Sequence, residues 1–306
     1  MANLLTLALG MSGILYNLRC RFGVLFPRTA SVLNYYRKLR SFPHLRHPRT
    51  LNEKIQWLKF HGDNRAIAPL ADKYAVREFV RGRGLEDILV PLLGRWDSVE
   101  DFRAAWPGLK APFVVKANNS CQTVIVVKDK AEADLDRICT TLQKWLDDRI
   151  FWGLFVEPHY KYIQPCIIAE RFLSEEGPAA QISSSLVDYK IWCFDGRPAC
   201  IWACTNRSSH GLEMSCFDTD WTPHPERLVY SDHFRKPLAA LPRPDGLDRM
   251  LECAAILSKG FPQVRVDFYC IGDRVYFGEM TFTSNGGCMP YFTKDYQQEL
   301  GALCRL

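Results

Sequence analysis

Four polar side chains near the C-terminal end of the chain have types and spacing that could bind a metal ion. They belong to residues 265–281, RVDFYCIGDRVYFGEMT, whose two halves alternate in polarity around a Gly-Asp dipeptide. This pattern predicts two antiparallel strands joined by a tight turn. If Asp267 lies opposite Glu279, then Arg265 lies opposite Thr281. Because successive strand residues point to opposite sides, all four side chains would share one face.

Two neighbouring carboxylates on one face indicate a cation between them. Asp267 and Glu279 would repel each other unless a positive group lay close to both. Mg²⁺ is a hard cation that takes oxygen ligands and shares them with phosphates. The opposite face would supply side chains for the core, namely Val266, Phe268, Tyr276 and Met280. The alternative is an ordinary amphipathic hairpin with a solvated polar face and an Arg–Asp pair across its strands.

Composition and charge are those of a globular protein with a basic N-terminal arm. The chain has 306 residues, of which 47% are hydrophobic and 24% charged, so it is long enough to bury a sizeable core. Residues 1–50 contain eight Arg or Lys and no Asp or Glu, which leaves 31 basic against 34 acidic residues in the remainder. The positive charge therefore belongs to the arm, and we expect no nucleic-acid partner.

The twelve cysteines are scattered and form no CxxC pair, which argues against a zinc site. Scattered thiols in a chain without a convincing signal peptide indicate a reducing compartment. We therefore expect a cytoplasmic location.

The first part of the arm, residues 2–17, is an apolar run that two arginines follow. It lacks the basic start and the small-residue exit of a signal peptide. It is also shorter than the roughly 20 residues that a membrane-spanning helix needs. Two interpretations remain open. The run forms a helix at the inner membrane face, where the basic residues meet anionic lipid, or it packs on the body of the protein.

Two helices are expected after the arm. Thr50 and Glu53 have the spacing of a capping box in front of the periodic sequence LNEKIQWLKF. A second helix is expected over about residues 70–84, with Asp72 and Lys73 in it.

Several blocks of sequence, in this order, resemble one known family. LNEKIQWLKFHGDNR, LADKYAVREFV and VPLLGRWDS, together with the R-V-D-F and G-E-x-T of the hairpin, resemble the TupA-like branch of the ATP-grasp superfamily. That branch is found in polysaccharide and teichuronopeptide biosynthesis. The resemblance covers roughly residues 48–306. It implies an α+β fold of two lobes with the nucleotide between them. The domains it implies are an arm (1–47), a helical region (48–112), a lid and hinge lobe (113–173) and a metal-binding lobe (174–306).

The resemblance also assigns the polar residues of the hairpin. In that family the Asp and the Glu hold Mg²⁺ against the nucleotide phosphates, which implies Asp267 and Glu279 as metal ligands. The Arg steadies the reacting phosphoryl group, which implies a catalytic role for Arg265. Many members have Asn two residues after the Glu, whereas this chain has Thr281. A hydroxyl can ligate Mg²⁺, so Thr281 is the third expected ligand.

A second hairpin resembles the lid over ATP. Strands are expected at Phe113–Lys116 and Thr123–Val127, and Lys116 matches the lysine that contacts the phosphates, while Lys73 is expected to reach them too. The usual lid loop is rich in glycine, so that its N–H groups can approach phosphate. Here the loop is Asn-Asn-Ser-Cys-Gln, with Ser120 as the expected contact. Asn tolerates positive φ, so a phosphate cradle is compatible with this loop; a loss of catalysis is the alternative.

Three further segments match the family. The segment Pro165–Leu173 resembles the hinge, which implies that Glu170 and the backbone of Phe172 face the nucleoside. In the segment DYKIWCFDG, Lys190 matches a phosphate or carboxylate contact, and Asp188 two residues earlier shares its strand face. Arg207 follows the next expected strand and is assigned to the substrate or the γ-phosphate.

A glycine-containing turn follows the metal hairpin. Ser284 to Gly287 would supply exposed N–H groups near the metal end, where an acceptor or an oxyanion could bind.

The resemblance implies an ATP-dependent ligase that joins a carboxylate to an amine through an acyl phosphate. Its expected cofactors are ATP and Mg²⁺. The expected partners are an amino acid and a carboxylate on a saccharide or peptide acceptor. One alternative is a glycosyltransferase with Asp218-Thr219-Asp220 as its D-x-D motif. Another is a nucleotide-binding protein that has lost catalysis.

Overall fold

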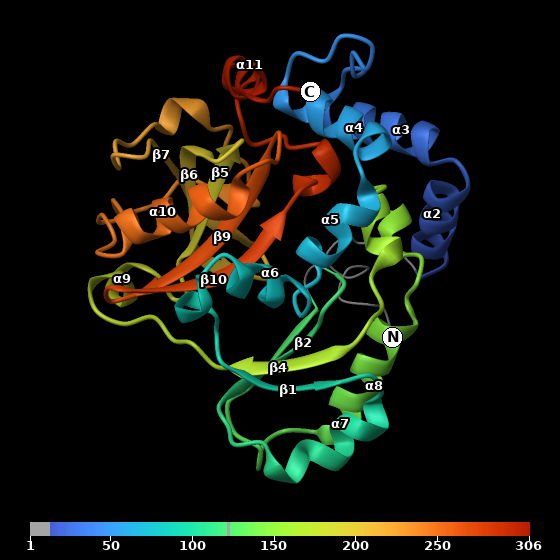
Figure 1. Ribbon diagram of the computed structural model, residues 1–306, viewed down its shortest axis with the longest axis vertical. Coiled ribbons are helices and arrows are strands. Elements are labelled where there is room, and N and C mark those ends of the chain that lie inside the picture. Colours follow the sequence, from blue (N-terminus) through green and yellow to red (C-terminus); the bar gives the residue numbers. More distant parts are fainter. Residues whose placement is uncertain (1–12, 121–122) are drawn as a thin grey trace. The chain divides into compact units, whose positions relative to one another are not determined.

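The computed structural model describes residues 13–120 and 123–306. Its chain divides into two compact units that gather separate segments of the sequence. The first unit comprises Met1–Ala30, Asp63–Arg77 and Val90–Leu173, and the second comprises Ser31–Gly62, Glu78–Leu89 and Ser174–Leu306. Each unit combines helices with a largely antiparallel sheet, so the predicted α+β class is confirmed (Figure 1). The predicted domain boundaries, which follow the chain, remain a prediction.

The first unit is built on a four-stranded antiparallel sheet with the order β1-β4-β2-β3. Its strands are β1 (Leu92–Trp96), β2 (Phe113–Ala117), β3 (Val124–Val127) and β4 (Ile167–Arg171). The longer helices of this unit are α2 (Gly13–Leu25), α5 (Asn64–Ala71), α7 (Val99–Ala105) and α8 (Leu135–Asp147).

One face of this sheet is covered by α7 and α8 (Figure 1). Asp134 caps the start of helix α8, because its carboxylate accepts the N–H of Arg137. The apolar stripe of the helix includes the buried Ile138 and Leu142. They pack in one cluster with alternate residues of β2, beginning at Phe113. The same alternation turns the other residues of β2 and β4 to the opposite face, where the polar side chains lie.

The second unit is built on a six-stranded sheet with the order β10-β9-β5-β6-β7-β8. All pairs are antiparallel except β7 and β8. The strands are β5 (Asp188–Phe194), β6 (Arg197–Ser208), β7 (Gly211–Phe217), β8 (Phe234–Arg235), β9 (Val264–Ile271) and β10 (Arg274–Thr281). The helices are α3 (Pro27–Leu39, whose first four residues belong to the first unit), α4 (Leu51–His61), α6 (Val76–Gly82, which begins in the first unit), α9 (Pro178–Ile182), α10 (Leu247–Ser258) and α11 (Lys294–Leu303).

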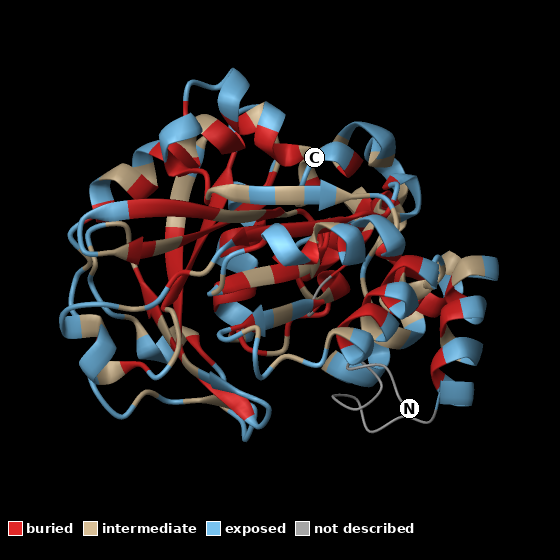
Figure 2. Ribbon diagram, turned by 90° about the horizontal axis from the view of Figure 1, so that it is seen from below, coloured by how far each residue is buried: buried red, intermediate tan, exposed pale blue. Residues whose placement is uncertain are grey.

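Helices cover both faces of the larger sheet. Helix α10 lies on one face (Figure 1). On the other face α4 and α11 enclose an apolar cluster that contains Leu51, Ile55, Trp192 and Leu300. Strand β5, which is third in the six-stranded order, is buried over its whole length. Figure 2 shows that buried residues concentrate on the interior strands, whereas the outer helices carry many exposed residues. The predicted capping box of α4 is present, since Thr50 accepts the N–H of Glu53 and Glu53 accepts the N–H of Thr50.

The predicted helix over residues 70–84 is wrong, because the chain leaves the helix at Asp72. Helix α5 ends at Ala71, and Asp72 has an extended backbone. Its carboxylate accepts the N–H groups of Tyr74 and Ala75, and a new helix begins at Val76. A short polar side chain that binds nearby backbone N–H groups competes with continuation of a helix.

The hairpin of β9 and β10 has the predicted register at its metal end. Asp267 pairs with Glu279, and Arg265 pairs with Thr281. A β-bulge between Phe277 and Glu279 then shifts the pairing by one residue. A bulge of this kind changes which face the later residues occupy.

As a result, the predicted face of Tyr276 is wrong. Tyr276 pairs with Tyr269 and lies on the polar face, whereas Phe277 pairs with Phe268 on the core face, with ring centroids 6.4 Å apart. The turn itself is the predicted Gly272-Asp273, and Gly272 has φ of +61°, which glycine adopts without strain.

The predicted N-terminal helix is described only in its later part. Residues 2–12 lie outside the described residues, and α2 begins at Gly13. Within the described ranges no helix is long and apolar enough to cross a membrane.

Candidate functional site

Six charged side chains gather on the α4 face of the larger sheet, on its strands β5, β6, β9 and β10. The strand register places Lys190 beside Asp267 and Asp267 beside Glu279. We call this set the charged cluster. Its members are Asp188, Lys190, Arg207, Arg265, Asp267 and Glu279. It contains three basic and three acidic side chains, so its formal charges cancel. Each basic side chain forms an ion pair with at least one of the acidic ones.

Asp267 is the most buried acid of the charged cluster. Arg265 binds it with two hydrogen bonds of 2.7 Å, from Nε to Oδ1 and from Nη2 to Oδ2, and Lys190 donates to Oδ2 as well. Burial alone would favour the neutral acid, but the charges of Arg265 and Lys190 together lower the pKa of Asp267 from its usual value. Asp267 is therefore a carboxylate held rigidly by two cations.

Lys190 joins Asp267 to Asp188. Its ammonium lies 2.6 Å from Asp188 Oδ2, and the same oxygen accepts a hydrogen bond of 3.0 Å from Arg207. Burial opposes the charge of the lysine, yet the two carboxylates raise the pKa of Lys190 above its usual value. Asp188 is therefore placed to orient the Lys190 ammonium. Arg207 is half-exposed and approaches the cluster from the end of β6.

Glu279 and Thr281 form the accessible side of the cluster. The Glu279 side chain is 37% exposed, whereas that of Asp267 is 4% exposed. Thr281 Oγ1 donates to Glu279 Oε1 over 3.1 Å and accepts from Arg265 Nη2 over 3.1 Å. The three predicted metal ligands are thus brought together, and Arg265 contacts all of them.

The donor set fits Mg²⁺ when a phosphate completes it. Carboxylate and hydroxyl oxygens are the ligands that this ion prefers. The described ranges contain no group of three or more His, Cys, Asp or Glu side chains that could hold a metal ion. Asp267 and Glu279 would therefore need oxygens from a bound nucleotide, and coordination by Asp267 would share its oxygens with Arg265 and Lys190.

The turn after β10 is buried rather than exposed, so the prediction of exposed N–H groups is wrong. Ser284, Gly286 and Gly287 are buried, and the N–H of Gly286 donates to Thr283 O. The hydroxyl of Ser284 accepts a hydrogen bond of 3.1 Å from Nη1 of Arg265. The turn therefore supports the charged cluster through a side chain.

In the first unit, the predicted nucleotide contacts form a second cluster. Lys116 of β2 and Glu170 of β4 share the polar face of the four-stranded sheet, and Lys116 Nζ lies 2.7 Å from Glu170 Oε2. Arg77 lies 3.2 Å from the other oxygen of Glu170 and also donates to Val90 O. No role was expected for Arg77, although it lies in the LADKYAVREFV block. Phe172, directly after β4, is half-buried.

The base of the lid loop is fixed by side-chain hydrogen bonds. Asn118 donates to Asp72 and to Gln164 O, and it accepts the N–H of Cys166. Lys73 donates from its ammonium to Ser120 O and from its N–H to Asn118 O. Lys73 is therefore a partner of the loop.

Two other features of the lid loop bear on the predictions. Of the described loop residues, none has a left-handed backbone, and residues 121–122 lie outside the described part. The hydroxyl of Ser120 donates to Thr123 Oγ1, so the predicted contact residue is held within the loop.

The D-x-D tripeptide is engaged in local contacts. Asp218 binds Arg227 through Oδ1 and His224 through Oδ2, over 2.5 and 2.8 Å. Asp220 accepts the N–H of Thr222. Both oxygens of Asp218 are used by the turn that contains it, which gives no support to a role in binding a sugar nucleotide.

Some solved structures of ATP-grasp enzymes are similar to this chain at low identity. D-alanine–D-alanine ligase from Bacillus anthracis is 16% identical, with a TM-score of 0.38, and the match covers 70% of this chain and 57% of that one. N5-carboxyaminoimidazole ribonucleotide synthetase is 11% identical, with a TM-score of 0.44, and the match covers 79% and 52%. D-alanine–D-alanine ligase from Helicobacter pylori is 16% identical, with a TM-score of 0.44, and the match covers 83% and 69%. The chain thus spans little more than half of the first two structures.

No curated protein matches this chain. The sequence model of the family described as TupA-like ATPgrasp matches residues 53–305, which is most of the chain. The match includes every residue of the charged cluster and also Lys116 and Glu170. The chain belongs to the TupA-like ATP-grasp family.

Proposed function

We propose that this protein is an ATP-dependent ligase that joins a carboxylate to an amine. The observation that carries the proposal is the charged cluster, in which Arg265 links Asp267, Glu279 and Thr281 on one strand face. In a chain of the ATP-grasp family, this is the arrangement that a reaction on a metal-bound phosphate requires. Transfer of a phosphoryl group depends mainly on positioned charges, and no covalent nucleophile of the protein is needed.

The reaction proceeds in two substitutions. A carboxylate oxygen of the first substrate attacks the γ-phosphorus of ATP, and the bond from that phosphorus to ADP breaks. The amine of the second substrate then attacks the acyl carbon, inorganic phosphate leaves, and the amine loses a proton. The products are an amide, ADP and phosphate. We propose that the substrates are an amino acid and a carboxylate on a saccharide or peptide polymer.

The residues of the charged cluster would hold the reacting groups in place. Asp267, Glu279 and Thr281 would hold Mg²⁺, which would supply positive charge to offset that of the phosphates. Lys190 and Arg265 are fixed by carboxylates before any substrate arrives, so they need little reorganisation to stabilise negative charge on a phosphoryl group. Arg207 is half-exposed and would contact the substrate or the γ-phosphate.

The first unit would contact the nucleotide. Lys116 and Lys73 would meet the phosphates together with Ser120. Glu170 and the backbone of Phe172 would meet the nucleoside. The ion pairs of Glu170 with Lys116 and Arg77 support this proposal, because they fix two of these side chains on the polar face of the sheet.

The experiment is ADP release from ATP and Mg²⁺ over a panel of amino acids and uronic acids. We expect release with one pair of substrates and its loss in Glu279→Ala. Glu252→Ala is the matched control, because Glu252 is an exposed acid that pairs with Arg249 outside the cluster. ATP binding without ADP under any condition would favour a catalytically inactive nucleotide-binding protein, for which the glycine-free lid loop is the supporting observation. If ATP did not bind, the proposal would be refuted.

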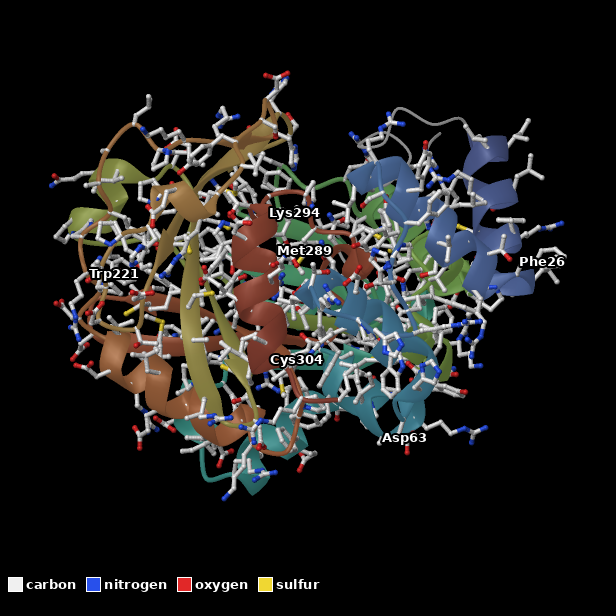
Figure 3. The ribbon with its side chains drawn as sticks, turned by 90° about the horizontal axis from the view of Figure 1, so that it is seen from above. Phe26, Asp63, Trp221, Met289, Lys294 and Cys304 are labelled. Atoms are coloured by element: carbon white, nitrogen blue, oxygen red, sulfur yellow. The ribbon has the colours of Figure 1, made fainter. Side chains whose placement is uncertain are left out.

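We propose further that the protein works on the cytoplasmic side of a membrane and contacts its surface through α2. One face of this helix packs on the first unit, where Tyr16 donates to Asp148 over 2.6 Å. The opposite face carries an exposed apolar stripe at helical spacing, formed by Ile14, Leu18, Phe22 and Leu25. Phe26 continues the exposed surface and is seen at its edge in Figure 3.

The surroundings of the stripe suit an anionic lipid surface. The first 50 residues contain eight basic and no acidic residues, and Arg21 lies within the stripe. We expect the protein to float with vesicles that contain phosphatidylglycerol and not with phosphatidylcholine vesicles, and Leu18→Glu to abolish flotation. Absence of binding to the anionic vesicles would refute the proposal. So would self-association that Leu18→Glu removes, because the stripe would then bind a second copy.

A further inference from the structure

Helix α4 carries a stripe of polar side chains that is fully buried. Asn52, Gln56 and Lys59 lie at positions i, i+4 and i+7, which is one face of a helix, and they are 3%, 1% and 2% exposed. The neighbouring stripe, with Leu51 and Ile55, packs in the apolar cluster of the second unit. Buried polar groups are costly unless they find hydrogen-bond partners, so this stripe needs defined ones.

Each of the three side chains of the polar stripe donates a hydrogen bond to the short segment Ser284–Met289. Asn52 binds Met289 twice, as it donates to the carbonyl over 3.0 Å and accepts the N–H over 2.9 Å. Gln56 donates to the carbonyl oxygens of Gly286 and Gly287 over 2.8 and 3.1 Å. Lys59 donates to Gly286 O over 2.9 Å, and its ammonium also binds Ser31 Oγ over 2.7 Å. Met289, labelled in Figure 3, is on the segment that leads from β10 to α11.

The segment needs external support because its backbone is unusual. Asn285, Gly286 and Gly287 have φ of +50°, +62° and +70°, three left-handed residues in succession. Glycine and asparagine tolerate this backbone better than other residues do, but three such residues in succession persist most readily where their surroundings hold them. A side chain at Gly287 would lie 2.9 Å from Ile55 and 3.1 Å from Gln56 of α4. The helix and the segment therefore fit closely against each other.

The same segment begins with the residue that contacts the charged cluster. Ser284 accepts a hydrogen bond of 3.1 Å from Nη1 of Arg265, whose remaining donors bind Asp267, Glu279 and Thr281. Lys59 and Gln56 thus bind Gly286, the backbone of the turn connects Gly286 with Ser284, and Ser284 binds Arg265.

We propose that Gln56 and Lys59 are positioning residues that fix the turn after β10 and thereby the guanidinium of Arg265. The proposal rests on the proposed function, in which Arg265 acts on the reacting phosphoryl group. It gives a role to Gln56 and Lys59, to which neither the capping box nor the family resemblance assigns one. Both side chains are buried and bind backbone carbonyl oxygens of the turn, so they would act on Arg265 through it.

The test compares three variants of the full-length protein in two measurements. Lys59→Met and Gln56→Leu remove the donors to the turn, and Lys54→Met is the control on the same helix, where the ammonium binds only Cys304 O among the described contacts. Hydrogen exchange followed by mass spectrometry should show faster exchange over residues 284–289, with β9 still protected, in the first two variants. In the ADP-release assay, kcat of these two variants should fall about 10- to 100-fold, because a small misplacement of a positioned group lowers the rate by about this factor. Their KM for ATP should change less than about twofold. Lys54→Met should match the wild type in both measurements.

A fourth variant tests the last contact without altering α4. Ser284→Ala should lower kcat to a similar extent while exchange over residues 284–289 stays slow. Normal kcat in Lys59→Met and Gln56→Leu, whether or not the turn exchanges faster, would overturn the proposal, and so would normal kcat in Ser284→Ala. If hydrogen exchange in Lys59→Met were fast throughout the second unit, Lys59 would stabilise the unit as a whole and not the turn in particular, which would also overturn the proposal. A wild-type protein that binds no ATP would refute the proposed function, whereas wild-type turnover that survives in these variants would refute this inference alone.

Discussion

Replacement of Lys190 by methionine should destabilise the second unit, because it leaves two carboxylates with fewer partners in a buried site. The Lys190 side chain is 10% exposed and contacts Asp188 and Asp267, which are 12% and 4% exposed. Loss of one partner from a buried ion pair costs about 3–5 kcal/mol. Arg265 keeps two hydrogen bonds to Asp267, and Arg207 keeps one to Asp188. We therefore expect a loss near the lower end, about 3 kcal/mol in the free energy of unfolding.

Urea-induced unfolding of the wild type and Lys190→Met measures this loss by linear extrapolation. The control is Arg243→Met, which removes one partner of an exposed ion pair with Asp248 in the same unit, and it should cost less than about 1 kcal/mol. The double variant Lys190→Met with Asp188→Asn should be more stable than Lys190→Met alone, since it removes one of the carboxylates left behind. A loss below about 1 kcal/mol in Lys190→Met, equal to that of the exposed control, would refute the view that this lysine balances the buried acids.

Two further predictions concern single residues. Asp267 has a lowered pKa, so its ionised form stabilises the folded state above the ordinary value of 3.8, and this contribution is lost as the pH falls through the folded-state pKa. The stability difference between the wild type and Asp267→Asn should therefore be largest near pH 7 and shrink below pH 3.8, as measured by urea unfolding over a pH series; a constant difference would contradict this. Gly23→Ala should loosen α2, because the added carbon would lie 1.8 Å from the carbonyl oxygen of Gly153. Limited proteolysis should cleave the variant faster near α2. Gly13→Ala should behave as the wild type, because its added carbon meets no atom of the described residues within 4 Å.

Local patterns in the sequence predicted the elements that bear the candidate site. Alternation and the Gly-Asp turn predicted the β9–β10 hairpin, with the register of Asp267 against Glu279. The prediction failed for Tyr276 because a bulge at Gly278 reverses the alternation. An added carbon at Gly278 would lie 3.0 Å from the carbonyl of Asp267, a close approach between strands that composition does not reveal. The predicted helix over residues 70–84 failed because Asp72 binds the N–H groups after it.

The sequence by itself determined the strands and helices that carry the chemistry, the capping of α4 and the family, since these depend on periodicity, caps and motifs within short segments. Only the tertiary structure decided which charges pair. Glu170 meets Arg77, 93 residues away, and Gln56 meets Gly286, 230 residues away. Such contacts depend on how whole elements pack, and a charged or polar side chain has many candidate partners until that packing is formed. The burial of Asp267 and Lys190 likewise follows from the sheet and its covering helices. Their ion-pair partners outweigh this burial, so they set the directions of both pKa shifts and keep the charged cluster ionised.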